Sequence, residues 1–526
     1  MIRHLFELLS ANVPGGLWLW VAMVGIGSFV AWFVYRISEV VDRRKVRQWM
    51  AGVLVLSILI YGVLWLKFPP SQPQTRLAIV PTQAFHLTPN AAESYVLQYR
   101  TFLALSRWLP AKKFVVLNPD WIYPVIPKNV AENPDSLPGF FKKMAVDRLL
   151  WTSWNAAAHS LIVWPQDLHT KGFGSRIQVQ GETLGQALRR ALPRFFREKN
   201  TARQEARLKR IPFVFEEDGW LDFARAKLLS FFKGDSLAQQ KLQRLAARLP
   251  QSALANAALA EIDLKIAFAK RALGAYTGDL LPLIFPLVTK ARKAAPNWSF
   301  PYLLAGKYFV AMEIWSKAQE NLFKSLQLYP NNDELYVLLS RLHPSRLRQI
   351  GFFSSEKALE RAVQVNPASI PGHLFLADAL YRQHDLKGAE KVYRELLALN
   401  PDLRSAQLAL AKFYIDATRY KEARTILRKI VEQDSTDGEA LYDLGMIAYL
   451  NGNRQKAQDY FLKAVGQGHY RNAYLYLAKI AEDQGDLDTA IAYLRRRIHE
   501  KWGPNDPFAE QARRHLRVLL QKKGVL

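Results

Sequence analysis

Two long apolar runs lie at the start of the chain, at residues 17–35 and 50–66. Neither run contains a charged residue, and the first would form a helix of about 28 Å, close to the thickness of the hydrocarbon core of a membrane. Tryptophans, which favour the membrane interface, lie near the ends of the runs, at Trp18, Trp20, Trp49 and Trp65. No small-residue cleavage site follows the first run, so the pattern favours two transmembrane helices within residues 1–67 over a cleaved signal peptide.

The loop between the two runs is strongly basic and sets the predicted orientation. Its positive side chains are Arg36, Arg43, Arg44, Lys45 and Arg47, whereas the tail before the first run has a single arginine. Because basic loops stay in the cytoplasm, both ends of the hairpin should face outward. We therefore expect a two-span protein of the bacterial inner (cytoplasmic) membrane whose soluble part is periplasmic.

After a proline-rich spacer at residues 68–74, apolar runs of strand length alternate with segments of helical periodicity. Strands are predicted at residues 76–82, 113–120, 148–154, 159–168 and 175–181, and helices at residues 89–109, 136–146 and from 182 onward. This β-α-β-α-β-β-β-α order predicts a small α/β domain at residues 75–188. No glycine-rich phosphate loop follows the first two strands. Trp151, Trp154 and Trp164 fit either a platform that stacks on sugars or the core of the sheet.

A period of about 34 residues runs through the second half of the chain. Alanines recur at Ala389, Ala423, Ala457 and Ala490, and prolines at Pro296, Pro330, Pro367 and Pro401, with steps of 33 to 37 residues. One repeat contains Tyr302, Ala305, Gly306, Phe309, Ala318, Leu322 and Pro330, and a later one contains Leu441, Leu444, Gly445, Ala457, Phe461 and Ala464. This pattern of small and large residues resembles the tetratricopeptide repeat (TPR) family. The strand RLAIVPT and the elements after it resemble the amino-terminal α/β domain of TolB and of TPR-bearing envelope proteins.

The TPR resemblance implies a mostly α-helical chain, in which residues 236–526 form an α-solenoid of paired helices with a capping helix after Pro507. The first helix of each pair should line a concave groove. By the register of the family, this groove includes Lys307, Asp378, Tyr381, Lys412, Tyr442, Met446, Tyr449 and Lys479. Lysine together with tyrosine suits a peptide or glycan that bears negative charge, and packing between helices is the alternative role for each tyrosine.

The chain of 526 residues carries 72 Lys and Arg against 46 Asp and Glu, a net charge of +26 that favours an acidic partner such as a glycan or an anionic lipid. Residues 189–235 form a basic connector that includes Arg189, Arg190, Arg194 and Arg197. This connector is either an amphipathic helix that meets anionic lipid or an acidic partner, or a solvated link between domains.

Catalytic motifs are missing from the sequence. Cysteine is absent, the ten histidines show no paired metal spacing, and neither HExxH nor G-x-S-x-G occurs. We therefore expect no catalytic residues, no metal site and no cofactor. Nucleic acid is not expected as a partner, because the predicted topology places the soluble part outside the cytoplasm.

These observations favour a membrane-anchored TPR scaffold that recruits or assembles cell-envelope machinery, with other envelope or membrane proteins as partners. Exopolysaccharide synthesis or export, secretion and pilus assembly are the candidate pathways. One alternative is an envelope sensor or regulator that binds a ligand in the α/β domain. Another is a subunit similar to the cytochrome c maturation factor that holds the apoprotein, although the α/β domain is not part of that factor.

Overall fold

The computed structural model describes most of the chain beyond residue 73. The described residues are 74–81, 91–108, 114–127, 130, 134–155, 158, 160–170, 173, 175–184, 186–188, 190–191, 218–232, 234–272, 280–501 and 506–525. The membrane hairpin predicted at residues 1–67 lies outside these residues. Within them, no helix combines the length and the apolar character that crossing a membrane requires.

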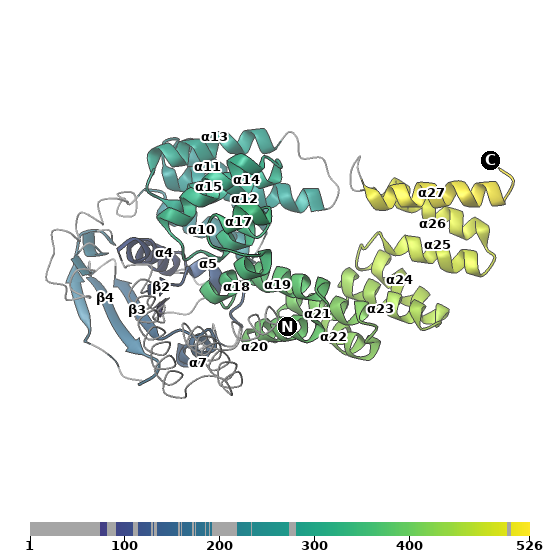
Figure 1. Ribbon diagram of the computed structural model, residues 1–526, viewed down its shortest axis with the longest axis horizontal. Helices are drawn as coiled ribbons and strands as arrows, with labels where there is room; N and C mark the ends of the chain where they lie inside the picture. Colours follow the sequence, from purple (N-terminus) through teal and green to yellow (C-terminus); the bar gives the residue numbers. More distant parts are fainter. Residues whose placement is uncertain are drawn as a thin grey trace, which may run out of the picture. The chain divides into compact units, whose positions relative to one another are not determined.

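A five-stranded mixed sheet forms the first part of the described chain, with the strand order β2-β1-β3-β4-β5 (Figure 1). The central strand β1 (Thr75–Pro81) pairs in parallel with β2 (Phe114–Val116) and with β3 (Arg148–Asn155). From β3 the sheet continues through antiparallel pairing to β4 (Ser160–Asp167) and β5 (Ile177–Gln180).

The parallel strand pairs require crossover connections, and helices supply them. Helix α4 (Ala91–Trp108) joins β1 to β2, and its buried face packs against the sheet and against helix α10 of the following array. The short helices α5 (Pro119–Ile122) and α7 (Leu137–Lys143), with the 3₁₀ turn η1 (Pro134–Ser136) between them, lead to β3. The order of strands and of the longer helices is the one that the sequence predicts, whereas α5 was not expected and overlaps the end of the strand expected at residues 113–120.

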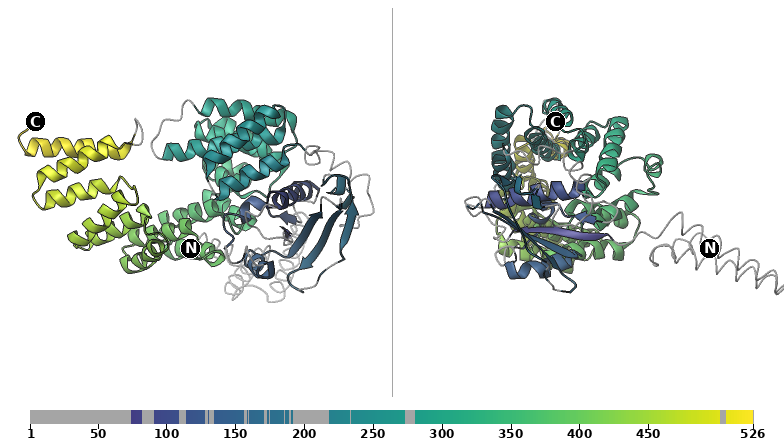
Figure 2. Two further views of the ribbon diagram at one scale, coloured as in Figure 1. Left: turned by 180° about the vertical axis from the view of Figure 1, so that it is seen from behind. Right: turned by 90° about the vertical axis from the view of Figure 1, so that its left-hand side faces the viewer.

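Paired helices make up the rest of the chain, and Figures 1 and 2 show them following one another to the carboxyl end. The helices are α10 (Trp220–Phe232), α11 (Asp235–Arg248), α12 (Ala253–Ala272), α13 (Leu281–Ala294), α14 (Ser299–Ala311), α15 (Trp315–Leu328), α16 (Asp333–Leu339), α17 (Pro344–Arg348), α18 (Ser355–Val365), α19 (Ile370–Arg382), α20 (Leu386–Leu399), α21 (Arg404–Asp416), α22 (Tyr420–Gln433), α23 (Gly438–Leu450), α24 (Arg454–Gly466), α25 (Ala473–Asp483), α26 (Leu487–His499) and α27 (Pro507–Lys522). The chain is therefore mostly helical, with a helical solenoid after a small sheet region.

Two features of this array differ from the sequence-based expectation. Helix α10 lies within residues 189–235, the range expected for a connector, and it packs against α11 as the first hairpin of the array. The 37-residue step between Pro330 and Pro367, expected as a longer loop, contains the additional short helix α17. Helix formation there is favoured by Pro344 at the first helical position and by His343, whose ring nitrogen accepts a hydrogen bond from the Ser345 amide.

Short polar side chains begin several helices of the array. The carboxylates of Asp385, Asp437 and Asp486 accept hydrogen bonds from the backbone amides three residues later, at 2.9, 3.0 and 3.0 Å. Each bond satisfies an amide that has no partner within its own helix. These caps therefore fix where α20, α23 and α26 start.

Small residues mark the close contacts within hairpins, as the repeat pattern predicts. A Cβ atom added at Gly445 in α23 would lie 2.7 Å from the Phe461 ring of α24, and one added at Gly306 in α14 would lie 2.5 Å from Leu322 of α15. Ala457 is fully buried in the α23–α24 hairpin. The repeat spacing thus identifies the positions at which two helices approach most closely.

The sheet shares its hydrophobic core with the first helices of the array. One continuous cluster of buried side chains extends from Leu77 in β1, through α4 and α10–α14, to Leu399 in α20. Residues Thr75–Leu526 form one compact unit. The α/β part, expected at residues 75–188, is therefore packed directly onto the helices and has no separate core.

Candidate functional site

The eight residues predicted for the groove lie on first helices of their hairpins, and the structure separates them into two groups. Lys307 on α14 lines a pocket next to α5. The others follow one another toward the carboxyl end: Asp378 and Tyr381 on α19, Lys412 on α21, Tyr442, Met446 and Tyr449 on α23, and Lys479 on α25. Helices α19, α21, α23 and α25, each the first helix of its hairpin, are called the groove helices below.

Four tyrosines gather around α23 and α25. The ring centroid of Tyr442 lies 4.9 Å from that of Tyr470 and 5.7 Å from that of Tyr476, and Tyr449 lies 5.5 Å from Tyr476. Tyrosine combines a large apolar ring with a hydroxyl group and is common at protein interfaces. Tyr476 is not among the groove residues predicted from the sequence. It lies on α25, 33 residues after Asp443 of α23, and so occupies the equivalent position of the next repeat.

Tyr449 is held between two cations. The guanidinium of Arg454 lies 4.0 Å from the centroid of its ring, and the ammonium of Lys479 lies 5.5 Å from it. The Tyr449 hydroxyl donates a hydrogen bond to Asp483 Oδ2 at 3.2 Å. Because both ends of the side chain are engaged, the ring has a fixed position next to Tyr476 on this surface.

Two of the three lysines assigned to the groove form ion pairs within the chain. Lys412 Nζ lies 2.6 Å from Glu439 Oε1, and Lys307 forms the corresponding pair with Glu334. Burial alone lowers the pKa of both ammonium groups, but the carboxylate partners outweigh it and raise the pKa of each above its usual value. The positive charge that the sequence places in the groove is therefore neutralised at these two positions.

Asp443 is the most unusual charged group of the groove helices. Its side chain is 2% exposed, and its Oδ2 atom has no hydrogen-bond partner in the part of the chain that the structure describes. Burial raises the pKa of Asp443 to about 7, against a lowering by Lys412. The carboxyl group thus changes its charge near neutral pH in the middle of this surface.

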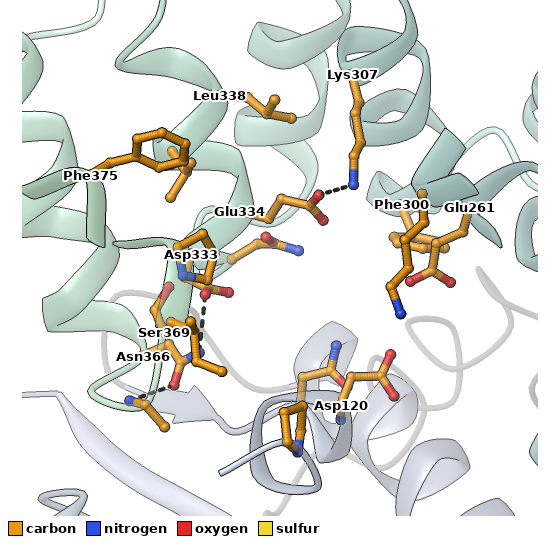
Figure 3. Close-up of a pocket in the computed structure, with 18 of the residues that line it drawn as sticks. Asp120, Glu261, Phe300, Lys307, Asp333, Glu334, Leu338, Asn366, Ser369 and Phe375 are labelled. Atoms are coloured by element: carbon orange, nitrogen blue, oxygen red, sulfur yellow. Dashed lines mark hydrogen bonds and ion pairs between the residues drawn. The ribbon is translucent and has the colours of Figure 1, made fainter. Parts of the chain in front are cut away.

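A pocket of about 430 Å³ opens where the sheet segment meets the helical array. Its walls come from α5, α12, α14 and α16, from the turn before α19 and from the start of α19. In Figure 3, Asp120 of α5 and Glu261 of α12 lie around the same opening as Glu334 of α16. A pocket of this size falls within the range of small-molecule and side-chain binding sites.

A buried ion triad closes one side of this pocket. Lys227 of α10 donates to Asp120 Oδ2 at 2.9 Å and to Glu261 Oε2 at 2.7 Å, and the Tyr95 hydroxyl bonds the other oxygen of Asp120. Burial alone lowers the pKa of Lys227, but Asp120 and Glu261 raise it well above its usual value, so the ammonium stays charged. The triad joins α5 of the sheet region to α10 and α12 of the array.

Asp333 lies at the start of α16 on the opposite wall. It is 5% exposed, and its Oδ2 accepts a hydrogen bond of 3.0 Å from Asn366. Burial raises the pKa of Asp333 to about 6, while hydrogen bonds from Ser369 and Asn366 act in the other direction. The sequence reading did not identify Asp120, Glu261, Asp333 or Glu334, because they lie on separate elements that no local motif connects.

The basic connector residues are largely outside the described chain. Arg190 donates from Nη1 to the carbonyl of Gln180 at 2.7 Å and so lies along the end of β5. Arg189, Arg194 and Arg197 lie outside the described residues. Within the described part of the chain, no three His, Asp or Glu side chains are grouped as a metal site would require.

The carboxyl-terminal half matches the tetratricopeptide repeat family, at residues 380–446 by one description of the repeat and at residues 352–404 and 442–505 by another. Over 152 residues the chain is 29% identical to the Superkiller complex protein 3 of Homo sapiens, a match that covers 27% of this chain and 10% of that protein. The chain thus spans about a tenth of the length of this relative.

Two solved structures are among those to which this chain is similar. The human IFIT1 dimer with m7Gppp-AAAA is 13% identical, with a TM-score of 0.46, over 84% of this chain and 96% of that chain. PilF of Pseudomonas aeruginosa is 15% identical, with a TM-score of 0.31, over 41% of this chain and 97% of that chain. These values carry no conclusion about function. Residues 352–505 carry tetratricopeptide repeats, and such repeats mediate contacts between proteins.

Proposed function

We propose that this protein is a membrane-anchored scaffold that recruits or assembles cell-envelope machinery, such as that for exopolysaccharide synthesis or export, secretion or pilus assembly. The observation that carries the scaffold part is the cluster of half-buried tyrosines on the groove helices, Tyr442, Tyr449 and Tyr476, called the tyrosine surface below. Solenoid repeats present extended surfaces to protein partners, and fixed aromatic rings supply much of the binding energy at such surfaces.

Membrane anchoring rests on the two apolar runs at residues 17–35 and 50–66 and on the basic loop between them. Kinship of the sheet region with the amino-terminal domain of TolB is part of the proposal and rests on the order of strands and helices that the sequence predicts. The positive surplus of the chain favours a location near an anionic membrane surface, since basic groups are attracted there. These sequence features are the support for proposing that the tyrosine surface lies outside the cytoplasm.

Site-specific photo-cross-linking in cells tests the scaffold function. A photoreactive residue is introduced at Asp378 or Lys479 on the groove helices, and, as the control, at the exposed Leu462 on the second helix α24. The groove positions should capture one defined protein in the membrane fraction, and position 462 should not. Equal capture at all three positions, or none at the groove positions, would contradict the proposal.

Orientation has its own test. A reporter that is active only outside the cytoplasm, fused after Leu526, should be active, and the protein should resist extraction from membranes by alkaline carbonate. An active cytoplasmic reporter at the same position would overturn the proposed topology without affecting the scaffold function.

A further inference from the structure

The pocket beside α5 holds more negative than positive charge in its interior. Four carboxylates line it: Asp120, Glu261, Asp333 and Glu334. Lys227 and Lys307 are the ammonium groups that pair with them. Of the two other cations at its wall, Lys265 is bound to Asp235 at 2.8 Å, and Arg341 is solvent-exposed at the rim. Without the paired Lys265 and the exposed Arg341, the interior of the pocket is acidic, although the chain as a whole carries a net charge of +26.

Glu334 is the carboxylate most open to a ligand. Its pair with Lys307 uses one oxygen, Oε1, and the Glu334 side chain remains 34% exposed. Figure 3 shows Glu334 between Lys307 on one side and the carboxylates of Asp333 and Asp120 on the other. An incoming positive group would therefore meet Glu334 first and would have further carboxylates close by.

The other walls of the pocket are apolar and aromatic. Phe268, Phe300 and Phe375 line it, together with the aliphatic side chains of α16. Phe375 is 48% exposed, and Lys307 Nζ already lies 5.8 Å from the centroid of the Phe268 ring. Aromatic faces attract cations, and apolar walls accommodate the methylene stem of a long basic side chain.

We infer that this pocket binds a lysine or arginine side chain presented by an extended segment of a protein partner. The charged head would contact Glu334, and the stem would lie against Phe300 and Phe375. A volume of about 430 Å³ holds one long side chain and part of its backbone. The inference rests on the proposed scaffold function, because it assigns part of the partner to a second site, which adjoins the first groove helix, α19, through Phe375.

The charges that line the pocket favour a cationic ligand over an anionic one. An anion would approach Glu334 and Asp120, while both buried ammonium groups are already bound to carboxylates. Burial raises the pKa of Asp333 and of Glu261 against the lowering effects of their partners, because loss of contact with water disfavours the charged carboxylate. A bound cation beside these groups would favour their charged form.

Binding of short peptides to the purified full-length chain tests the inference. The probes are acetylated and amidated pentapeptides with an uncharged dye, in which the sequence Ala-Leu-X-Leu-Ala carries arginine, lysine, norleucine or glutamate at X. Fluorescence anisotropy should show saturable binding of the arginine and lysine peptides, weakened by added salt. The norleucine and glutamate peptides should bind at least tenfold more weakly.

Two variants test residues of the pocket, and a third variant, on the groove helices, is the control. Glu334→Gln should weaken binding of the arginine peptide about tenfold, and Phe375→Ala, at an exposed rim position, should weaken it severalfold with little effect on folding. Glu439→Gln removes the corresponding ion pair from the groove helices, at a similar side-chain exposure of 29% against 34%, and should leave binding within twofold of the wild type.

The inference is overturned if no basic peptide binds up to about 1 mM, if the glutamate peptide binds as well as the arginine peptide, or if Glu334→Gln and Phe375→Ala both bind like the wild type. A loss caused by Glu439→Gln, with Glu334→Gln unaffected, would assign the basic segment to the groove helices. The scaffold function would then stand and the pocket inference would fail. Unchanged photo-cross-linking at Asp378 and Lys479 distinguishes these outcomes from failure of the scaffold itself.

Discussion

Lys307 of α14 pairs with Glu334 of α16, and the same relationship joins Lys412 of α21 to Glu439 of α23. In both pairs the partners are 27 residues apart, so each lysine reaches from one first helix to the start of the next. The two pairs differ in burial: the Lys307 side chain is 19% exposed and the Lys412 side chain 48%. The repeat thus places the same lysine–glutamate ion pair in a more buried environment at Lys307 and in a more exposed one at Lys412.

Neutralising the glutamate should therefore have unequal effects on stability. Glu334→Gln leaves a largely buried ammonium with a weaker partner and should lower the free energy of unfolding by about 1–3 kcal/mol. Glu439→Gln removes a pair near the surface and should cost about 0–1 kcal/mol, because water screens it. Thermal unfolding of both variants, at low and high salt, measures the difference. Equal losses would show that burial does not control the strength of these pairs.

The helical hairpins could be predicted from the sequence because their signal is local and repeated. Gly445 and Ala457 lie at contacts between paired helices, and the period of 34 residues makes such positions visible without a structure. The sheet could be predicted for a similar reason, since each strand is a short apolar run bounded by turn residues. Helix α17 was missed because a segment of five residues contains too little periodicity to detect.

The pocket could not be predicted, because its residues come from segments that only the tertiary structure brings together. Lys227 lies 107 residues from Asp120 and 34 from Glu261. The pairing of the groove lysines did have a signal. A lysine followed 27 residues later by a glutamate occurs at Lys307 and at Lys412. This spacing joins the first helices of neighbouring hairpins.

Removing the ammonium of the buried triad should destabilise the junction between sheet and array. Lys227→Met keeps the length of the side chain but leaves Asp120 and Glu261 without their common cation. Loss of one partner from a buried ion pair typically costs about 3–5 kcal/mol. Hydrogen exchange should then show faster exchange in α5, α10 and α12 than in α23. If exchange is unchanged in all four helices, the triad does not hold the junction together.

The contact between Gly445 and Phe461 predicts that the effect of Gly445→Ala on stability depends on the side chain at position 461. Gly445→Ala places a Cβ about 2.7 Å from the Phe461 ring, an overpacking that should cost about 1–3 kcal/mol and exceed the gain of about 1 kcal/mol in helix propensity. In a Phe461→Leu background the clash is relieved, so Gly445→Ala should raise the melting temperature. A loss of equal size in both backgrounds would contradict the contact.

The last helix is attached through a buried ion pair that should control its docking. Arg497 of α26 donates from Nη2 to both carboxylate oxygens of Asp506 at 2.8 Å, and Asp506 also caps α27. Asp506→Ala removes the pair and the cap, at a cost of about 3–5 kcal/mol that falls mainly on α27. Amides of α27 should exchange faster while those of α21 stay protected. Glu510→Ala, at an exposed pair with Arg513, is the control and should change neither.

Asp443 predicts a pH dependence of stability. Its folded-state pKa of about 7 lies above the usual 3.8, so the folded chain keeps a proton that the unfolded chain releases. Stability from this group is therefore fully present below about pH 4 and is lost as the pH rises toward 7, by at most about 1.4 kcal/mol per pH unit. The groups around it are Lys412, Glu439, Asp437 and Asp416, of which only Lys412 is positive and opposes the shift.

Asp443→Asn tests this sign because the amide stays neutral at every pH and keeps the shape of the side chain. The variant should match the wild type most closely at about pH 4 and below and should gain on it as the pH rises, by about 2–4 kcal/mol at pH 8. Other acids, including Asp333, also titrate in this range, so the quantity to measure is the difference in melting temperature between variant and wild type at each pH. A difference for Asp443→Asn that does not change with pH would mean that Asp443 is ionised in the folded chain throughout this range, and that its burial is compensated.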